Sequence, residues 1–284
     1  PLSTTYRFLE WKYFQIRESN FRFETDTNGA VTNIRNLYEN RYLNTLTYHY
    51  ENHRKLYPHS IRVEAEHSKL FARLQVTAKY HFNYTDGGGL DVRSFAGKFF
   101  YLKNKTNSTR FETERFHFNM TGPNGYEDYA YQDYFVGRNN FDDFYSRQIM
   151  ERDGYFKVRT DLLSSKVGRD DNWLFAVNLS TTIPDKINVL KLLPVKIPLR
   201  LFADLGTNGM LVKNKLKSEQ FLYNAGLELR LLNETLVFYF PLLYSKPFKE
   251  YIQSTIPEKK FWKTMSFSIQ IRQYNWDKII SKWL

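Results

Sequence analysis

Phe261-Trp-Lys-Thr-Met-Ser-Phe-Ser-Ile-Gln-Ile-Arg272 sets a pattern that much of the chain repeats. From Met265 onward, apolar residues (Met265, Phe267, Ile269, Ile271) alternate without interruption with polar residues (Ser266, Ser268, Gln270, Arg272). A period of two is typical of a β-strand, because successive side chains project to opposite sides of the pleat. The stretch therefore predicts a strand with one apolar face and one polar face.

Residues 173–180, 197–206 and 223–231 alternate in the same way, and their polar faces carry full charges such as Arg200, Asp204 and Glu228. Residues 70–84 form the longest alternating run. This run exceeds the ~5–6 residues of an average strand in a soluble protein and suits a tilted membrane-spanning strand of ~9–11 residues with extensions. We expect an all-β fold, a transmembrane antiparallel up-and-down β-barrel of ~10–14 strands with apolar residues outward. A soluble sandwich stays open as an alternative, because its strands alternate too.

The remaining strands are expected at residues 6–17, 41–54, 61–66, 90–102 and 116–120. Asn28-Gly29 predicts a hairpin turn, and Gly87-Gly88-Gly89 and Leu232-Asn233-Glu234 predict further tight turns. Residues 103–115 are expected to form a polar surface loop, residues 126–165 to contain both strand and an in-folded loop, and residues 245–260 to form a long connection. Short turns at one end and long loops at the other are typical of outer-membrane barrels. We expect one domain over residues 1–284.

The composition agrees with a barrel. Aromatic residues make up 18% of the 284 residues, which suits aromatic girdles at two membrane interfaces. The mean hydropathy is -0.57, which does not exclude a barrel because only alternate residues of its strands face lipid. The net charge is +11, yet Lys and Arg are spread along the chain, so we expect no nucleic-acid partner. The absence of cysteine excludes disulfides, thiol nucleophiles and Cys-based metal sites.

The sequence contains no catalytic constellation. His49-Tyr-Glu-Asn-His53 has the outer spacing of a zinc-protease motif, but Glu51 sits one position late and the segment is expected to be a strand. We therefore expect no metal site and no cofactor. The polar faces mix charges of both signs: Arg62, Glu64, Glu66, Arg73, Lys79, Arg159, Asp161, Arg200, Asp204, Glu228, Arg230 and Arg272. Such charges pair off in a confined space, which predicts a plugged or narrow interior rather than a wide pore.

Three blocks, Tyr134 to Phe141, Asn172 to Ser180 and Leu199 to Gly206, resemble the end of the outer-membrane assembly-factor barrels (the BamA-like, surface-antigen superfamily). That superfamily has an in-folded loop with an Arg-Gly-aromatic motif and a late strand ending Phe-x-Asp-x-Gly. The resemblance implies that Arg138 is the loop arginine, that Asp204 is the acid it contacts inside the barrel, and that Gly206 closes the motif. The loop order here is Gly-Arg instead of Arg-Gly.

More specifically, the runs Phe135-Val-Gly-Arg138, Ser146 to Gly154, Lys157 to Leu163 and Tyr239 to Ser245 look similar to the C-terminal membrane region of large Bacteroidetes proteins. The N-terminal parts of those proteins resemble aminopeptidase-N-like zinc metallopeptidases. The resemblance spans roughly residues 125–272. It implies that any zinc aminopeptidase activity would lie in a region N-terminal to this chain, which begins at Pro1 without an initiator Met and is interpreted as a mature or truncated piece.

We therefore expect an outer-membrane barrel that anchors, as a C-terminal domain, a larger protein. Its expected partners are the lipid bilayer of the outer membrane, with lipopolysaccharide and other outer-membrane or periplasmic proteins as candidates. Two alternatives remain: a component of outer-membrane protein assembly or translocation, and a soluble β-domain that binds another molecule.

Overall fold

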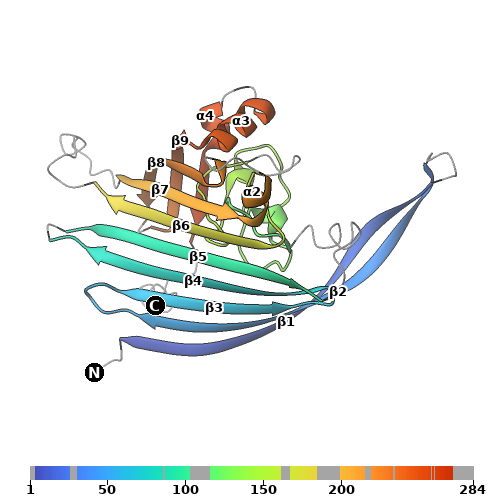
Figure 1. Ribbon diagram of the computed structural model, residues 1–284, viewed down its shortest axis with the longest axis horizontal. Coiled ribbons are helices and arrows are strands. Elements are labelled where there is room, and N and C mark those ends of the chain that lie inside the picture. The colour runs from blue at the N-terminus through green and yellow to red at the C-terminus, as the bar shows by residue number, and fades with distance from the viewer. Residues whose placement is uncertain are drawn as a thin grey trace, which may run out of the picture.

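The computed structural model describes residues 4–25, 31–85, 87–102, 116–160, 167–183, 199–214, 219–232, 234–256, 258 and 260–270. Ten strands form one antiparallel sheet in sequence order, from β1 to β10 (Figure 1). They are β1 (Thr5–Thr25), β2 (Val31–Asn52), β3 (His59–His67), β4 (Phe71–Asn83), β5 (Gly89–Tyr101), β6 (Trp173–Thr182), β7 (Leu199–Asn208), β8 (Leu222–Leu231), β9 (Leu236–Tyr244) and β10 (Ser266–Ile269). The predicted antiparallel meander is confirmed.

Helices lie at the ends of strands. They are α2 (Gly209–Asn214), α3 (Lys246–Thr255) and α4 (Lys260–Thr264), with the 3₁₀ turns η2 (Gly125–Glu127) and η3 (Tyr145–Arg147). Residues 245–260, expected to be a plain connection, therefore contain a helix. α3 begins with Pro247 in its first turn, where the missing N–H of proline costs no hydrogen bond.

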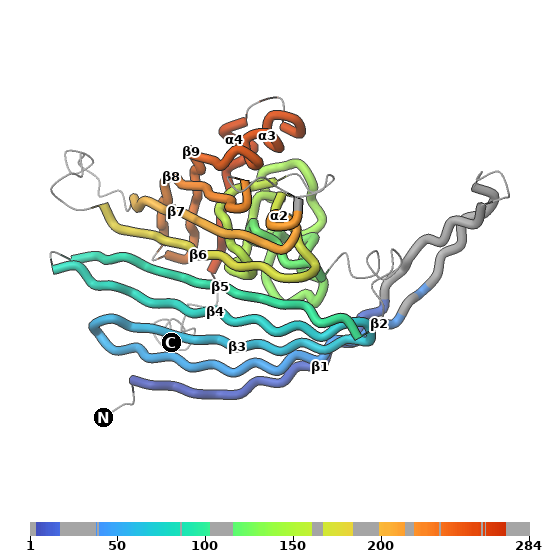
Figure 2. The backbone as a smooth tube through the Cα atoms, in the orientation of Figure 1, coloured from blue at the N-terminus to red at the C-terminus, as the bar shows by residue number. Residues whose placement is uncertain are grey.

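The sheet is curved, and residues 116–160 lie on its concave side (Figure 2). We call residues 116–160 the in-folded segment, the concave side of the sheet its inner face and the convex side its outer face. Phe118 and Met120 of this segment are fully buried in the core with Phe95 and Phe99 of β5. The expected strand at residues 116–120 is therefore wrong. Its alternating apolar residues fill the core, and Phe118 forms only an isolated bridge with Asp170.

The expected closure into a barrel does not occur within the described residues. Among the named strands there, β1 pairs with β2 and β10 pairs with β9, so the sheet has two edges. β10 has four residues against 21 in β1. The in-folded segment also contacts β10 along the edge that does not pair with β9. There the Ile149 N–H donates to the Phe267 carbonyl at 2.8 Å. The Asn28-Gly29 turn, the 103–115 loop, Asp161 and Arg272 lie outside the described residues.

In the described part of the chain, no helix is long and apolar enough to cross a membrane.

Candidate functional site

The inner face of the sheet is charged and buried. Alternation places the polar residues of each strand on this face, and the buried charged side chains among them are Glu64, Glu66, Arg73, Arg93, Arg200, Asp204 and Glu228. Most of them form ion pairs within the sheet: Arg73 with Glu66, Arg62 with Glu64, Arg230 with Glu228 and Arg200 with Asp91. The expected pairing of opposite charges is confirmed for these residues.

Lys157 of the in-folded segment forms the most buried ion pair with the sheet. Its Nζ lies 2.5 Å from Oδ1 of Asp204 on β7, and its backbone N–H donates to Oδ2 of the same carboxylate at 3.2 Å. The Asn178 side-chain amide on β6 donates to Oδ1 at 2.8 Å. The side chains of Lys157 and Asp204 are 4% and 0% exposed, so each charge depends on the other for compensation.

A second set of contacts holds the in-folded segment further along the sheet. Glu151 lies 2.5 Å from the Lys79 ammonium on β4 and 3.3 Å from the Arg93 guanidinium on β5. Arg93 also donates to the carbonyl of Asp153 at 2.9 Å. Burial alone would raise the pKa of Glu151, but Lys79 and Arg93 outweigh it and lower that pKa below its usual value. The segment is therefore fixed by charges as well as by its apolar core.

The structure gives Arg138 and Asp204 different partners. Arg138 lies over the Tyr131 ring, 4.7 Å from its centroid, and its Nη1 donates to the Asp128 carboxylate at 2.9 Å. Asp128 belongs to the in-folded segment, so this contact is internal to the segment. The cation on Asp204 is Lys157. Lys157 was part of the resembling runs, but local sequence gives no signal for a contact across 47 positions.

Gly206 closes the Phe-x-Asp-x-Gly motif at a crowded position. A Cβ built on Gly206 would lie 2.5 Å from Sδ of Met120 and 2.9 Å from the carbonyl oxygen of Phe175. The lack of a side chain thus lets the in-folded segment approach β7. Asp204 and Gly206 both contact the in-folded segment where it packs on β7. Arg138, the arginine expected beside Asp204, pairs with Asp128 instead.

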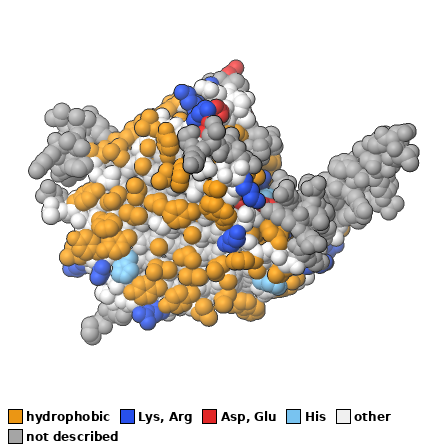
Figure 3. Space-filling model, viewed as in Figure 1, with side chains coloured by type: hydrophobic (Ala, Val, Ile, Leu, Met, Phe, Trp, Pro, Cys, Tyr) orange, Lys and Arg blue, Asp and Glu red, His pale blue; other side chains and the backbone are white. Residues whose placement is uncertain are grey.

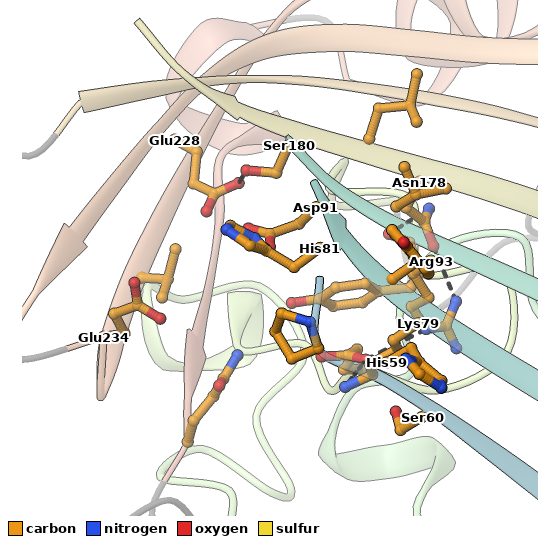
Figure 4. Close-up of a pocket in the computed structure, with 18 of the residues that line it drawn as sticks. His59, Ser60, Lys79, His81, Asp91, Arg93, Asn178, Ser180, Glu228 and Glu234 are labelled. Atoms are coloured by element: carbon orange, nitrogen blue, oxygen red, sulfur yellow. Dashed lines mark hydrogen bonds and ion pairs between the residues drawn. The ribbon is translucent and has the colours of Figure 1, made fainter. Parts of the chain in front are cut away.

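A polar cavity of about 610 Å³ opens on the inner face near the turns that join β2 to β3, β4 to β5 and β8 to β9. Figure 4 shows its wall, with His81 and Asp91 side by side and Glu228 near Ser180. His81 Nδ1 lies 2.5 Å from the Asp91 carboxylate, and the Ser180 hydroxyl donates to Glu228 at 2.9 Å. The cavity is lined by charges of both signs that bond to one another. The cavity lining is therefore polar and largely charge-paired, and its described residues include no nucleophile held by a base and an orienting group.

His49 and His53 do not form a metal centre with Glu51 in the described structure. The His49 ring stacks on Phe8 with centroids 4.2 Å apart, and His53 Nε2 lies 2.9 Å from Glu51. Among the described residues, no group of three or more His, Cys, Asp or Glu side chains could hold a metal ion.

No protein-family model matches the chain, and no curated protein matches it. The large antiparallel sheet of ten strands is established, and the resemblance to assembly-factor barrels remains a hypothesis about its origin.

Proposed function

We propose that the sheet is the wall of a transmembrane β-barrel of the outer membrane, and that the chain serves as the membrane anchor of a larger protein. The supporting observation is that the two faces are inverted relative to a soluble protein. On β7, Leu205 of the outer face is 50% exposed, while the neighbouring Asp204 of the inner face is 2% exposed. Hydrophobic side chains cover the outer face over much of the sheet (Figure 3). Lipid is the solvent that such a face fits.

The height of the apolar surface also supports the proposal. On β4, the outer face runs from Ala72 to Phe82, and its members are Ala72, Leu74, Val76, Ala78, Tyr80 and Phe82. The ten rises of ~3.4 Å between Ala72 and Phe82, tilted by ~40°, cover roughly 26 Å along the membrane normal, which is close to the ~25 Å apolar band of outer-membrane barrels. Lys98 of β5 interrupts the band, and its Nζ lies 2.7 Å from the Asn172 side-chain oxygen.

The spacing between strands differs at the two ends of the sheet, with exceptions at each end. At one end, residues 53–58, 84–88 and 232–235 separate paired strands, but β6 and β7 are separated by residues 183–198. At the other end, residues 102–172, 209–221 and 245–265 separate paired strands, but only residues 26–30 and 68–70 separate β1 from β2 and β3 from β4. By analogy with known barrels, the end with mostly short separations would face the periplasm.

Anchoring is the function that the interior favours. The in-folded segment fills the concave side, and the charges around the cavity form ion pairs. A filled interior with paired charges suits a scaffold better than a wide diffusion pore. The zinc aminopeptidase activity implied by the resemblance would then belong to another region of the same protein.

Assembly or translocation of other proteins is the second candidate, and the edge of β1 favours it. Among the named strands in the described residues, β1 pairs only with β2, and an unpaired strand edge can accept another strand. The corresponding edge of β10 already contacts the in-folded segment. Depletion separates the two functions. Loss of a general assembly factor would lower many outer-membrane proteins together, whereas loss of an anchor would release only the protein it carries.

Reconstitution tests membrane insertion. The purified chain is refolded with lipid vesicles, and the vesicles are floated through a density gradient after an alkaline carbonate wash. We expect the chain to float with the vesicles and to migrate as a compact form on gels unless it is boiled. A monomer that stays in detergent-free buffer and does not float would overturn the proposal and favour a soluble β-domain.

A further inference from the structure

Aromatic and basic side chains gather where the in-folded segment meets the last two strands. We call Phe144, Tyr145, Arg147, Phe261, Trp262 and Lys263 the rim cluster. Its four aromatic residues are each between 42% and 57% exposed. The cluster belongs to η3 and α4, at the end of the sheet that carries the long connections.

The rings of the rim cluster extend the outer face of the sheet. Phe261 stacks on Phe240 of β9 with centroids 6.2 Å apart, and Phe144 stacks on Phe267 of β10 with centroids 5.1 Å apart. Arg147 links the two halves of the cluster by donating to the carbonyl of Trp262. The aromatic surface is therefore continuous with the face that we assign to lipid.

A cavity of about 170 Å³ lies beside these rings, between the in-folded segment and the helices α3 and α4. Arg147, Lys263 and the buried Arg159 line it and supply three cations. Thr160 also lines it, and its buried hydroxyl has no hydrogen-bond partner among the described residues.

Two acids, Asp142 and Asp143, also line this cavity and do not neutralise its described cations. Asp143 accepts the Ser146 N–H at 2.9 Å. The Asp142 side chain is 85% exposed, and it lies 3.9 Å from the Lys263 ammonium. Among the described lining residues, three cations outnumber two acids, and the buried Thr160 hydroxyl can donate a hydrogen bond.

We propose that this cavity binds the phosphate group of a membrane lipid headgroup, with the rim cluster placed at the membrane interface. The inference rests on the proposed membrane location. Arginine and lysine beside interfacial aromatic rings are the residues that recognise anionic headgroups, because the rings sit at headgroup depth while the cations contact phosphate. The four exposed rings favour a lipid over a free anion, which would need no apolar rim.

Native mass spectrometry tests the proposal on the whole chain. The protein is inserted into vesicles of phosphatidic acid and phosphatidylcholine, extracted in mild detergent, and its bound lipids are counted. We expect phosphatidic acid to be enriched over its share in the vesicles. Enrichment should fall roughly fivefold in Arg147→Gln and in Lys263→Gln, and about twenty-five-fold in the double variant. Lys69→Gln, an exposed lysine at the same end of the sheet, is the matched control and should keep the enrichment.

Equal retention of both lipids by the unchanged protein would overturn the proposal, and so would a loss of enrichment in the control as great as in the double variant. Displacement of the lipid by millimolar inorganic phosphate would identify a free-anion site instead and also overturn it. Flotation of every variant is measured first. Failure to float would refute the membrane location itself, whereas floating without enrichment would refute only the lipid site.

Discussion

At the residue scale, the ion pair of Lys157 and Asp204 lies almost wholly out of water. Two charges removed from water are tolerated only because each compensates the other and Asn178 and the Lys157 N–H complete the bonding of the carboxylate. Removing one partner leaves an unpaired buried charge, which is far more harmful than removing an exposed one. The pair is therefore a sensitive probe of the docking of the in-folded segment.

Lys157→Met keeps most of the side-chain volume but removes the cation beside Asp204. We expect a loss of about 3–5 kcal/mol in the free energy of unfolding, because Asp204 remains buried without its partner. Urea unfolding in detergent, followed by tryptophan fluorescence, measures it. Lys55→Met, at an exposed lysine, is the control and should change stability little. Equal effects of both variants would contradict the role of the pair.

Glu151 predicts how the docking depends on pH. Lys79 and Arg93 lower its folded-state pKa, so its contribution to stability is full above the unfolded value of about 4.3 and is lost as the pH falls through the lowered value. Protease cleavage within residues 116–160 should therefore rise below about pH 4.3. Glu151→Gln should be cleaved more readily at pH 7 and vary less with acidification. Parallel pH curves for both proteins would refute this role.

At the scale of elements, the in-folded segment and the sheet fit together through positions that lack side chains. A Cβ on Gly97 of β5 would lie 2.5 Å from the ring of Phe118, and all three of its nearest atoms belong to that ring. Phe118 is fully buried between β5 and the segment. The glycine thus makes room for one aromatic ring that connects the two elements.

Gly97→Ala should destabilise the protein by about 1–3 kcal/mol, the typical cost of overpacking a core. In Phe118→Leu the smaller side chain leaves space for the new methyl group. The double variant should therefore be less destabilised than the sum of the two single changes, by roughly 0.5–3 kcal/mol of coupling. If the two single changes add up in urea unfolding, the contact between residue 97 and the Phe118 ring does not determine how the segment packs on β5.

The elements differ in how well the sequence predicts them. β4, β6, β7 and β8 were predicted within about two residues of their observed ends, because strict alternation reports a strand with two unlike faces directly. Phe116 to Met120 alternates as well but fills the core, since alternation records which residues are apolar and not which element they pack against. α3 was missed because its ten residues lie inside a connection and include Pro247 in the first turn.

The candidate site was predicted less completely than the strands. Asp204 and Gly206 were singled out and do contact the in-folded segment. The partner of Asp204 is Lys157 instead of Arg138. Which of these two cations reaches Asp204 depends on how the irregular in-folded segment folds, and local sequence patterns do not predict that fold.

At the scale of the whole molecule, apolar side chains lie on the outer face of the sheet and charges lie on its inner face. Such a sheet would be poorly soluble in water and would gain stability in lipid. Leu205 and Leu56 allow a matched comparison, because both are exposed leucines, one on the outer face of β7 and the other in the turn between β2 and β3.

Leu205→Arg should impair insertion into vesicles by roughly 2–4 kcal/mol, the cost of an arginine near the middle of the membrane. Leu56→Arg should insert normally, because a turn stays in water. The fraction of each variant that floats with vesicles over a urea series gives the difference. Similar insertion of both variants would argue that the outer face of β7 does not meet lipid.

The most direct test of the proposal that the sheet faces lipid is a cysteine scan with a quencher confined to the lipid tails. The chain has no cysteine, so single cysteines at outward Val177 and Leu179 and at inward Asn178 and Ser180 of β6 can each carry one fluorophore. In vesicles, the account predicts strong quenching at the two outward positions and weak quenching at the two inward ones. Equal quenching at all four positions, or none at any of them, would contradict it.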